Sequence, residues 1–132
     1  MQKYFLKTTS RSVVIEIQNL SDCNFNFEDF VIKHGNNKFL NSLPEVIQSK
    51  TCITIGHGSN GIMTGVEGWA KFSANNNNKN VLNISWMVEF FGSSSISVTI
   101  DNLSVERENL PESTSKNVMA RFIIINPYVK DE

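Results

Sequence analysis

The sequence has few of the residues on which enzymes and metal sites usually depend. Two histidines and two cysteines occur in 132 residues, and their spacing fits no zinc site. The patterns C-x-x-C, H-E-x-x-H and G-x-S-x-G are absent, as is a phosphate-binding loop. We therefore expect a protein that is not an enzyme and that holds no metal or other cofactor.

Long apolar runs are also missing. No window reaches the roughly eighteen apolar residues of a membrane-spanning helix, and Tyr4-Phe5-Leu6 is too short for the apolar part of a signal peptide. We therefore expect a soluble protein, either cytoplasmic or released without a classical signal peptide. Without a secretory signal, Cys23 and Cys52 are predicted to be free thiols.

Charge is equally scarce. Only 19% of the residues are charged and the net charge is −1, so the sequence offers no basic surface for nucleic acid. Any binding function must then depend on the local chemistry of a few side chains.

Strand periodicity dominates what is present. Alternating apolar residues predict strands over 13–18, 25–32, 51–55, 65–74, 82–88, 96–100 and 119–125. Phe27 and Phe30 are three residues apart, so a bulge near Glu28 and Asp29 is needed to keep both on one face. About seven strands without a helical period predict an all-β fold, a single-domain antiparallel β-sandwich over residues 1–132.

Four segments between these strands are predicted to be loops or turns. Residues 35–49 show no period, 75–79 are an asparagine-rich hairpin loop, and 102–117 are mainly a connection. In the glycine-rich stretch 58–69, Gly58, Gly61 and Gly65 are predicted turn positions, because glycine reaches positive φ without steric cost.

Several segments carry a family resemblance. Residues 59–69 resemble the S-[DN]-G-x-M-T-G-x-E-G-W signature of the aegerolysins and the aegerolysin-like insecticidal crystal toxins. In the same order, residues 11–19 resemble the family's R-S-V-x-V-x-I-x-N strand and 33–35 its K-H-G turn. Residues 84–86 and 90–93 are similar to its tryptophan strand and aromatic-Gly-Ser loop, although Met87 and Glu89 replace the usual Asp and Pro.

This resemblance covers about residues 11–100 and implies both a fold and a function. Aegerolysins recognise sphingolipid headgroups or sterol-rich membranes, and many act as the membrane-targeting half of a pore-forming toxin with a larger perforin-like partner. A looser similarity links the chain to actinoporins and fungal lectins, but residues 1–10 lack the long amphipathic helix of an actinoporin. The matched motifs nominate seven lipid-binding side chains: Lys33, His34, Glu67, Trp69, Trp86, Phe90 and Phe91.

Some of these side chains also have a structural interpretation. Trp86 shares the parity of Leu82 and Ile84, which favours a place in the core. Phe90 and Phe91 precede Gly92 in a predicted loop, where they either cap the sandwich or insert into a bilayer interface.

A second function from a different class fits the same residues. In a lectin, Trp69 or Trp86 would stack on a sugar face while Asn60, Ser93 and Glu67 bind its hydroxyl groups. The sequence leaves this carbohydrate-binding alternative open.

Overall fold

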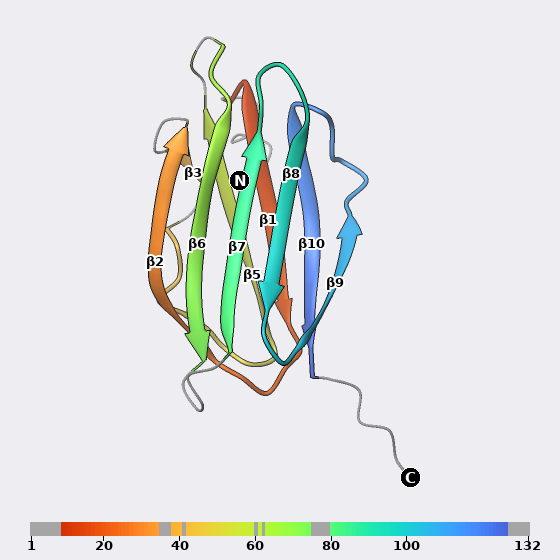
Figure 1. Cartoon of the computed structure of the whole chain (residues 1–132). Coiled ribbons are helices and arrows are strands. Elements are labelled where there is room, and N and C mark those ends of the chain that lie inside the picture. Colours follow the sequence, from red (N-terminus) through yellow and green to blue (C-terminus); the bar gives the residue numbers. More distant parts are fainter. Residues whose placement is uncertain are drawn as a thin grey trace.

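Two β-sheets lie face to face and enclose a hydrophobic core (Figure 1). The computed structural model describes residues 9–34, 38–40, 42–59, 61, 63–74 and 80–126. Their strands are β1 (Arg11–Asn19), β2 (Phe25–His34), β3 (Lys38–Phe39), β4 (Val46–Ile47), β5 (Thr51–Ser59), β6 (Val66–Ala74), β7 (Val81–Val88), β8 (Ser94–Ile100), β9 (Ser104–Asn109) and β10 (Asn117–Ile125). Within these residues we find no helix that is long and apolar enough to cross a membrane. The predicted all-β sandwich is confirmed, with more strands than the expected seven or so.

Each sheet contains five strands. The first has the order β3-β5-β1-β10-β9 and the second the order β4-β2-β6-β7-β8. Neighbouring strands are antiparallel except for β1 and β10, which run parallel with Ser12 opposite Asn117 and Asn19 opposite Ile124. The first and last strands therefore lie side by side within one sheet, which joins the two ends of the described fold.

The core follows from the period of two along the strands. In β7, Leu82, Ile84, Trp86 and Val88 are buried, whereas the residues between them are exposed or half-buried. The strand β1 departs from this rule because Val14, on its outer face, is also buried and packs with Met119. This second buried face explains why the opening strand carries three consecutive apolar residues, Val13 to Ile15.

The bulge predicted in β2 is confirmed. Phe27 lies opposite Phe72 and Asp29 opposite Lys71, so Glu28 is the extra residue. The shift places Phe27 and Phe30 on the same side, with ring centroids 6.1 Å apart.

Two predicted loops contain strands. The segment 35–49 includes β3 and β4, each of two residues, which are too short to show any period. The segment 102–117 includes β9, an edge strand whose side chains are mostly exposed and therefore need no apolar alternation. The hairpin loop predicted at 75–79 lies outside the described residues.

In the glycine-rich stretch, Gly58, Gly61 and Gly65 do not have the positive φ that was predicted for them. Gly58 belongs to β5, opposite Ser12, and among the described glycines Gly92 is the one with positive φ. In this stretch, it is Met63 that takes a left-handed conformation, with φ of 56°. Gly65 is required by close approach instead, because a Cβ there would lie 2.6 Å from the carbonyl oxygen of Val88.

Candidate functional site

One end of the sandwich, at the top of Figure 1, holds the predicted site. The strands β2, β5 and β7 end there, and β1, β6 and β8 begin there. Two adjoining pockets, of about 440 and 190 Å³, open at this end and along the outer face below it, and both are lined by Glu67 and Met87. Every residue nominated by the sequence lines one of them: His34, Glu67, Phe90 and Phe91 the larger, and Lys33, Glu67, Trp69 and Trp86 the smaller.

A charged cluster occupies the border between the two pockets. A second register shift in β2, between Ile32 and His34, leaves Lys33 as an extra residue beside Glu67. Lys33 Nζ lies 3.9 Å from one carboxylate oxygen of Glu67, and His34 Nε2 lies 3.7 Å from the other. Exposed ion pairs of this kind contribute about 1 kcal/mol or less to stability, so the cluster is poorly explained as a structural device.

The loop between β7 and β8 presents the two phenylalanines differently. The guanidinium of Arg11 lies 4.1 Å above the Phe90 ring and donates a hydrogen bond of 3.0 Å to the Phe90 carbonyl oxygen. Phe91 packs edge-on against Phe90, with centroids 4.8 Å apart, and remains 72% exposed. Of the two predicted roles, capping the sandwich describes Phe90, which is held against the fold. Phe91 faces solvent and is available for insertion into a bilayer.

Gly92 makes this loop possible. Its φ is +127°, a conformation that residues with a side chain rarely adopt, and a Cβ at this position would clash with the Glu89 carboxylate. Glu89, which stands where the family has proline, thus folds over the glycine and lines the larger pocket.

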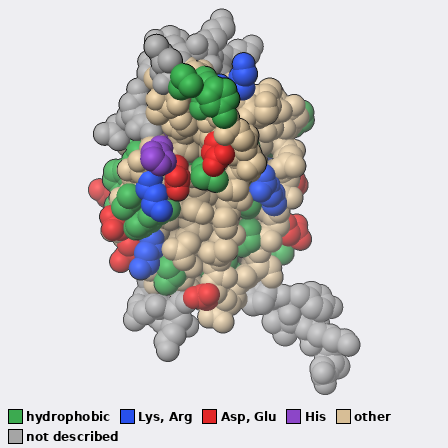
Figure 2. Space-filling model, turned by 45° about the horizontal axis from the view of Figure 1, so that its top comes forward, with side chains coloured by type: hydrophobic (Ala, Val, Ile, Leu, Met, Phe, Trp, Pro, Cys, Tyr) green, Lys and Arg blue, Asp and Glu red, His purple; other side chains and the backbone are tan. Residues whose placement is uncertain are grey.

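Met63 is a site residue that the sequence reasoning missed. It lines the larger pocket and is 61% exposed, and among the described residues at this end it and Phe91 are the most exposed apolar side chains. Its place in the M-T-G part of the matched signature was the available signal. Figure 2 shows apolar side chains at the upper end of this face, with a histidine and acidic and basic side chains grouped below them.

The two tryptophans have separate environments. Trp86 is only 2% exposed, and its Nε1 donates a hydrogen bond of 2.8 Å to Nδ1 of the buried His57, so the core interpretation holds. Trp69 is half-buried on the outer face of the second sheet, between Val31 and Ser85 on the neighbouring strands.

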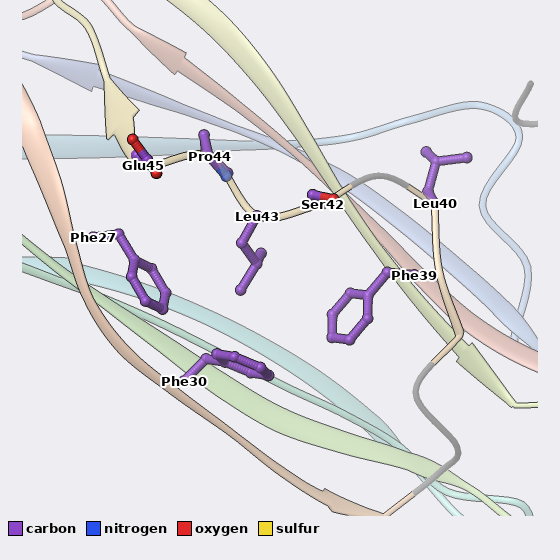
Figure 3. A pocket seen from close by; sticks show the side chains of 8 residues that line it. All are labelled: Phe27, Phe30, Phe39, Leu40, Ser42, Leu43, Pro44 and Glu45. Carbon is purple, nitrogen blue, oxygen red and sulfur yellow. The ribbon is translucent and has the colours of Figure 1, made fainter.

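A separate aromatic cavity, which the sequence analysis did not predict, lies on the side of the sandwich. It has a volume of about 640 Å³ and is lined by Phe27 and Phe30 of β2, Phe39 of β3, Leu40 and the segment Ser42–Glu45. Figure 3 shows the three rings and Leu43 pointing toward a common space. Phe39 fell in a segment predicted to be an irregular loop, which concealed its role.

Comparison with known proteins supports the fold. No model of a protein family matches the sequence, and no curated protein matches it. Among solved structures, the lipid binding protein Nakanori superposes with a TM-score of 0.72 and 9% identity, covering 93% of this chain and 77% of that one. The RahU protein, solved in complex with a TRIS molecule, superposes with a TM-score of 0.68 and 11% identity, covering 93% and 99%. At such identities the likeness concerns the fold alone, and it confirms the β-sandwich that the sequence predicted.

Proposed function

We propose that this protein is a peripheral membrane-binding protein, not an enzyme, and that the end of the sandwich described above contacts the lipid. One observation carries the proposal: exposed Phe91 and Met63 line the same pocket as the charged cluster around Glu67. Apolar side chains that face water beside polar groups are suited to the bilayer interface, which offers both environments within a few ångströms.

Insertion of Phe91 supplies a sizeable part of the affinity. Removing a phenylalanine side chain from water is favourable by roughly 1.5–3 kcal/mol. This gain is available because Phe91 is 72% exposed before binding and loses little packing when it moves into lipid. Arg11 holds the backbone of Phe90, so the loop reaches the membrane already ordered.

The pocket chemistry fits a zwitterionic headgroup. Lys33 and His34 are suited to a phosphate, while Glu67 and Glu89 are suited to a headgroup amine. The carboxylate of Glu89 beside the loop opposes deep entry and opposes binding to strongly anionic surfaces. We propose sphingolipid-containing or sterol-containing membranes as the target, as the aegerolysin resemblance implies, together with a perforin-like partner for pore formation.

Vesicle co-sedimentation tests this proposal. We expect saturable binding to phosphatidylcholine vesicles that contain sphingomyelin and cholesterol, weaker binding to strongly anionic vesicles, and no dye release by the isolated protein. Absence of binding to every sphingolipid or sterol mixture would contradict lipid recognition, and dye release without a partner would contradict the need for one.

A carbohydrate-binding function is the second candidate, and one observation favours it. Trp69 lies in a cross-strand row with Ser85 and Ser97 on the outer face of the second sheet, an aromatic platform flanked by hydroxyl groups. Trp86 is buried and cannot stack on a sugar, and Asn60 lies outside the described residues. Glycan-array binding that a free sugar competes for, and that Trp69→Ala abolishes, would place this function above lipid recognition.

A further inference from the structure

The aromatic cavity is separate from the proposed lipid site. Among the described residues, none lines both the cavity and either of the two pockets at the end of the sandwich. Its volume of about 640 Å³ falls within the range of pockets that hold small ligands, roughly 300–1,000 Å³. It therefore needs an explanation of its own.

The rings of the cavity form angled walls. Phe30 lies between Phe27 and Phe39, with 6.1 Å between centroids on each side and interplanar angles of 51° and 88°. Rings set at such angles bound a concave corner that a small rounded group can enter, as Figure 3 shows.

Both outer rings are fixed from behind by core residues. Phe39 stacks on the buried His57, with centroids 4.9 Å apart and planes 20° apart. Phe27 meets Phe72 edge-on at 5.7 Å. The walls are thus formed before any ligand arrives, which lowers the ordering cost of binding.

The charge that lines the cavity, among the described residues, is negative. Among the described residues that line it, Glu45 alone is charged, and its backbone oxygen accepts a hydrogen bond of 2.8 Å from the Phe27 amide. That bond holds Glu45 beside the aromatic wall, at one end of the cavity in Figure 3. Glu28 and Asp29 follow Phe27 on β2, and Lys71 lies opposite Asp29. An anionic ligand is disfavoured here, and a cationic one is favoured.

We infer that this cavity binds a quaternary ammonium group, with Phe27, Phe30 and Phe39 as the cage and Glu45 as the counter-charge. A methylated ammonium combines an apolar surface, which suits phenyl walls and Leu43, with a positive charge, which the ring faces attract. It is also less strongly hydrated than a primary ammonium, so its entry requires less desolvation.

The test uses tetramethylammonium and choline as probes, with binding followed by chemical-shift changes of the cavity amides. Their uncharged isostere, 3,3-dimethyl-1-butanol, has nearly the same shape as choline. We expect both cations to bind and the isostere to bind at least about fivefold more weakly, as the loss of a cation–π contact predicts. Equal affinity for choline and its isostere, or no binding of either cation, would overturn the inference.

Two variants examine the cage without emptying the cavity. Phe30→Leu keeps an apolar side chain but removes a ring face, and Glu45→Gln keeps the shape but removes the charge; each should weaken choline binding at least about fivefold. Glu106→Gln, on the exposed face of β9, is the matched control and should leave it unchanged. Unaltered choline binding in both cavity variants, with native spectra, would also overturn the inference.

Two further experiments identify the source of the quaternary ammonium group and distinguish the aromatic cavity from the proposed lipid site. Competition by soluble phosphocholine supports a ligand free in solution, and competition by phosphatidylcholine vesicles alone supports a lipid headgroup. Phe91→Ser should leave choline binding intact, because Phe91 does not line the cavity. Loss of choline binding in Phe91→Ser would overturn the assignment of the group to this cavity.

Discussion

Two aromatic pairs, Trp86 with His57 and Phe91 with Phe90, occupy opposite environments. Trp86 lies in the core and its indole nitrogen is hydrogen-bonded to His57, whereas Phe91 faces water and rests on Phe90 at the tip of the next loop. Phe91, which is available for binding, follows Trp86, which maintains the fold, by five positions in the sequence. Aromatic residues in a matched motif therefore do not share a role, and burial decides which role each has.

The difference has a local cause in the backbone. Trp86 follows the alternation of β7, which directs every second side chain into the core up to Val88. Beyond Val88 the strand ends, and Gly92, at φ +127°, reverses the chain before β8 begins. Phe91 lies outside the alternation, so no sheet face buries it.

The largest expected effect is on the buried pair. Trp86→Ala should lower the free energy of unfolding by about 3–5 kcal/mol, since it leaves a cavity in the core and removes the donor to His57 Nδ1. Urea denaturation measures this change. A loss below about 1 kcal/mol would show that the pair does not anchor the sandwich.

A smaller effect on stability is expected at Phe90, the member of the exposed pair that packs against Arg11. Phe90→Ala should lower the free energy of unfolding by about 1–2 kcal/mol, because the ring is half-buried under the guanidinium of Arg11. Arg11→Gln, which keeps the hydrogen-bonding end but removes the charge, should cost less. If Phe90→Ala has no effect on thermal unfolding, Phe90 does not stabilise the fold, and the proposed difference between Phe90 and Phe91 is contradicted.

The charged cluster should affect selectivity more than stability. Glu67→Gln removes a carboxylate whose ion-pair partners among the described residues, Lys33 and His34, are exposed, so the free energy of unfolding should change by about 1 kcal/mol or less. Lys33 and His34 would then be left without their counter-charge, and binding should move toward anionic vesicles. Co-sedimentation against vesicles of graded phosphatidylserine content measures this change, and an unaltered preference would remove Glu67 from the site.

The smallest effect is expected on the reactivity of the cysteines, one of which is buried and the other exposed. Cys52 is exposed and Cys23 is buried, so Cys52 should be the one that reacts with a thiol reagent in the native protein. Partial burial and then the charge of Glu16 raise the pKa of the Cys52 thiol above its ordinary value. The thiolate fraction should therefore rise only at higher pH than in a peptide, and Glu16→Gln should lower the midpoint. A midpoint at or below the peptide value would contradict this electrostatic description.

The sequence motifs nominated residues that the fold brings close together, although they missed details of the fold around them. Lys33, His34, Glu67 and the aromatic loop come from three motifs far apart in the chain, and they meet because β2, β6 and β7 are neighbours whose matched segments lie at one end. The period of two identified the core strands and the β2 bulge because those features depend on burial alone.

Other features depend on tertiary contacts that no local pattern encodes. The strands β3 and β4 have two residues each, and Gly65 is explained only by the passing carbonyl of Val88. The aromatic cavity forms where β2, β3 and the segment 42–45 come together. Because Phe27, Phe30 and Phe39 are brought together only by the fold, their positions in the sequence did not predict the cavity.

The most direct test of lipid recognition compares Phe91→Ser with Leu20→Ser in vesicle co-sedimentation and thermal unfolding. Leu20 is 40% exposed and follows β1 at the opposite end of the sandwich, so it controls for the loss of exposed apolar surface. Phe91→Ser should weaken binding to sphingomyelin–cholesterol vesicles roughly tenfold or more while changing the free energy of unfolding by less than about 0.5 kcal/mol. Leu20→Ser should leave binding unchanged. Equal binding by the wild-type protein and Phe91→Ser would contradict the account.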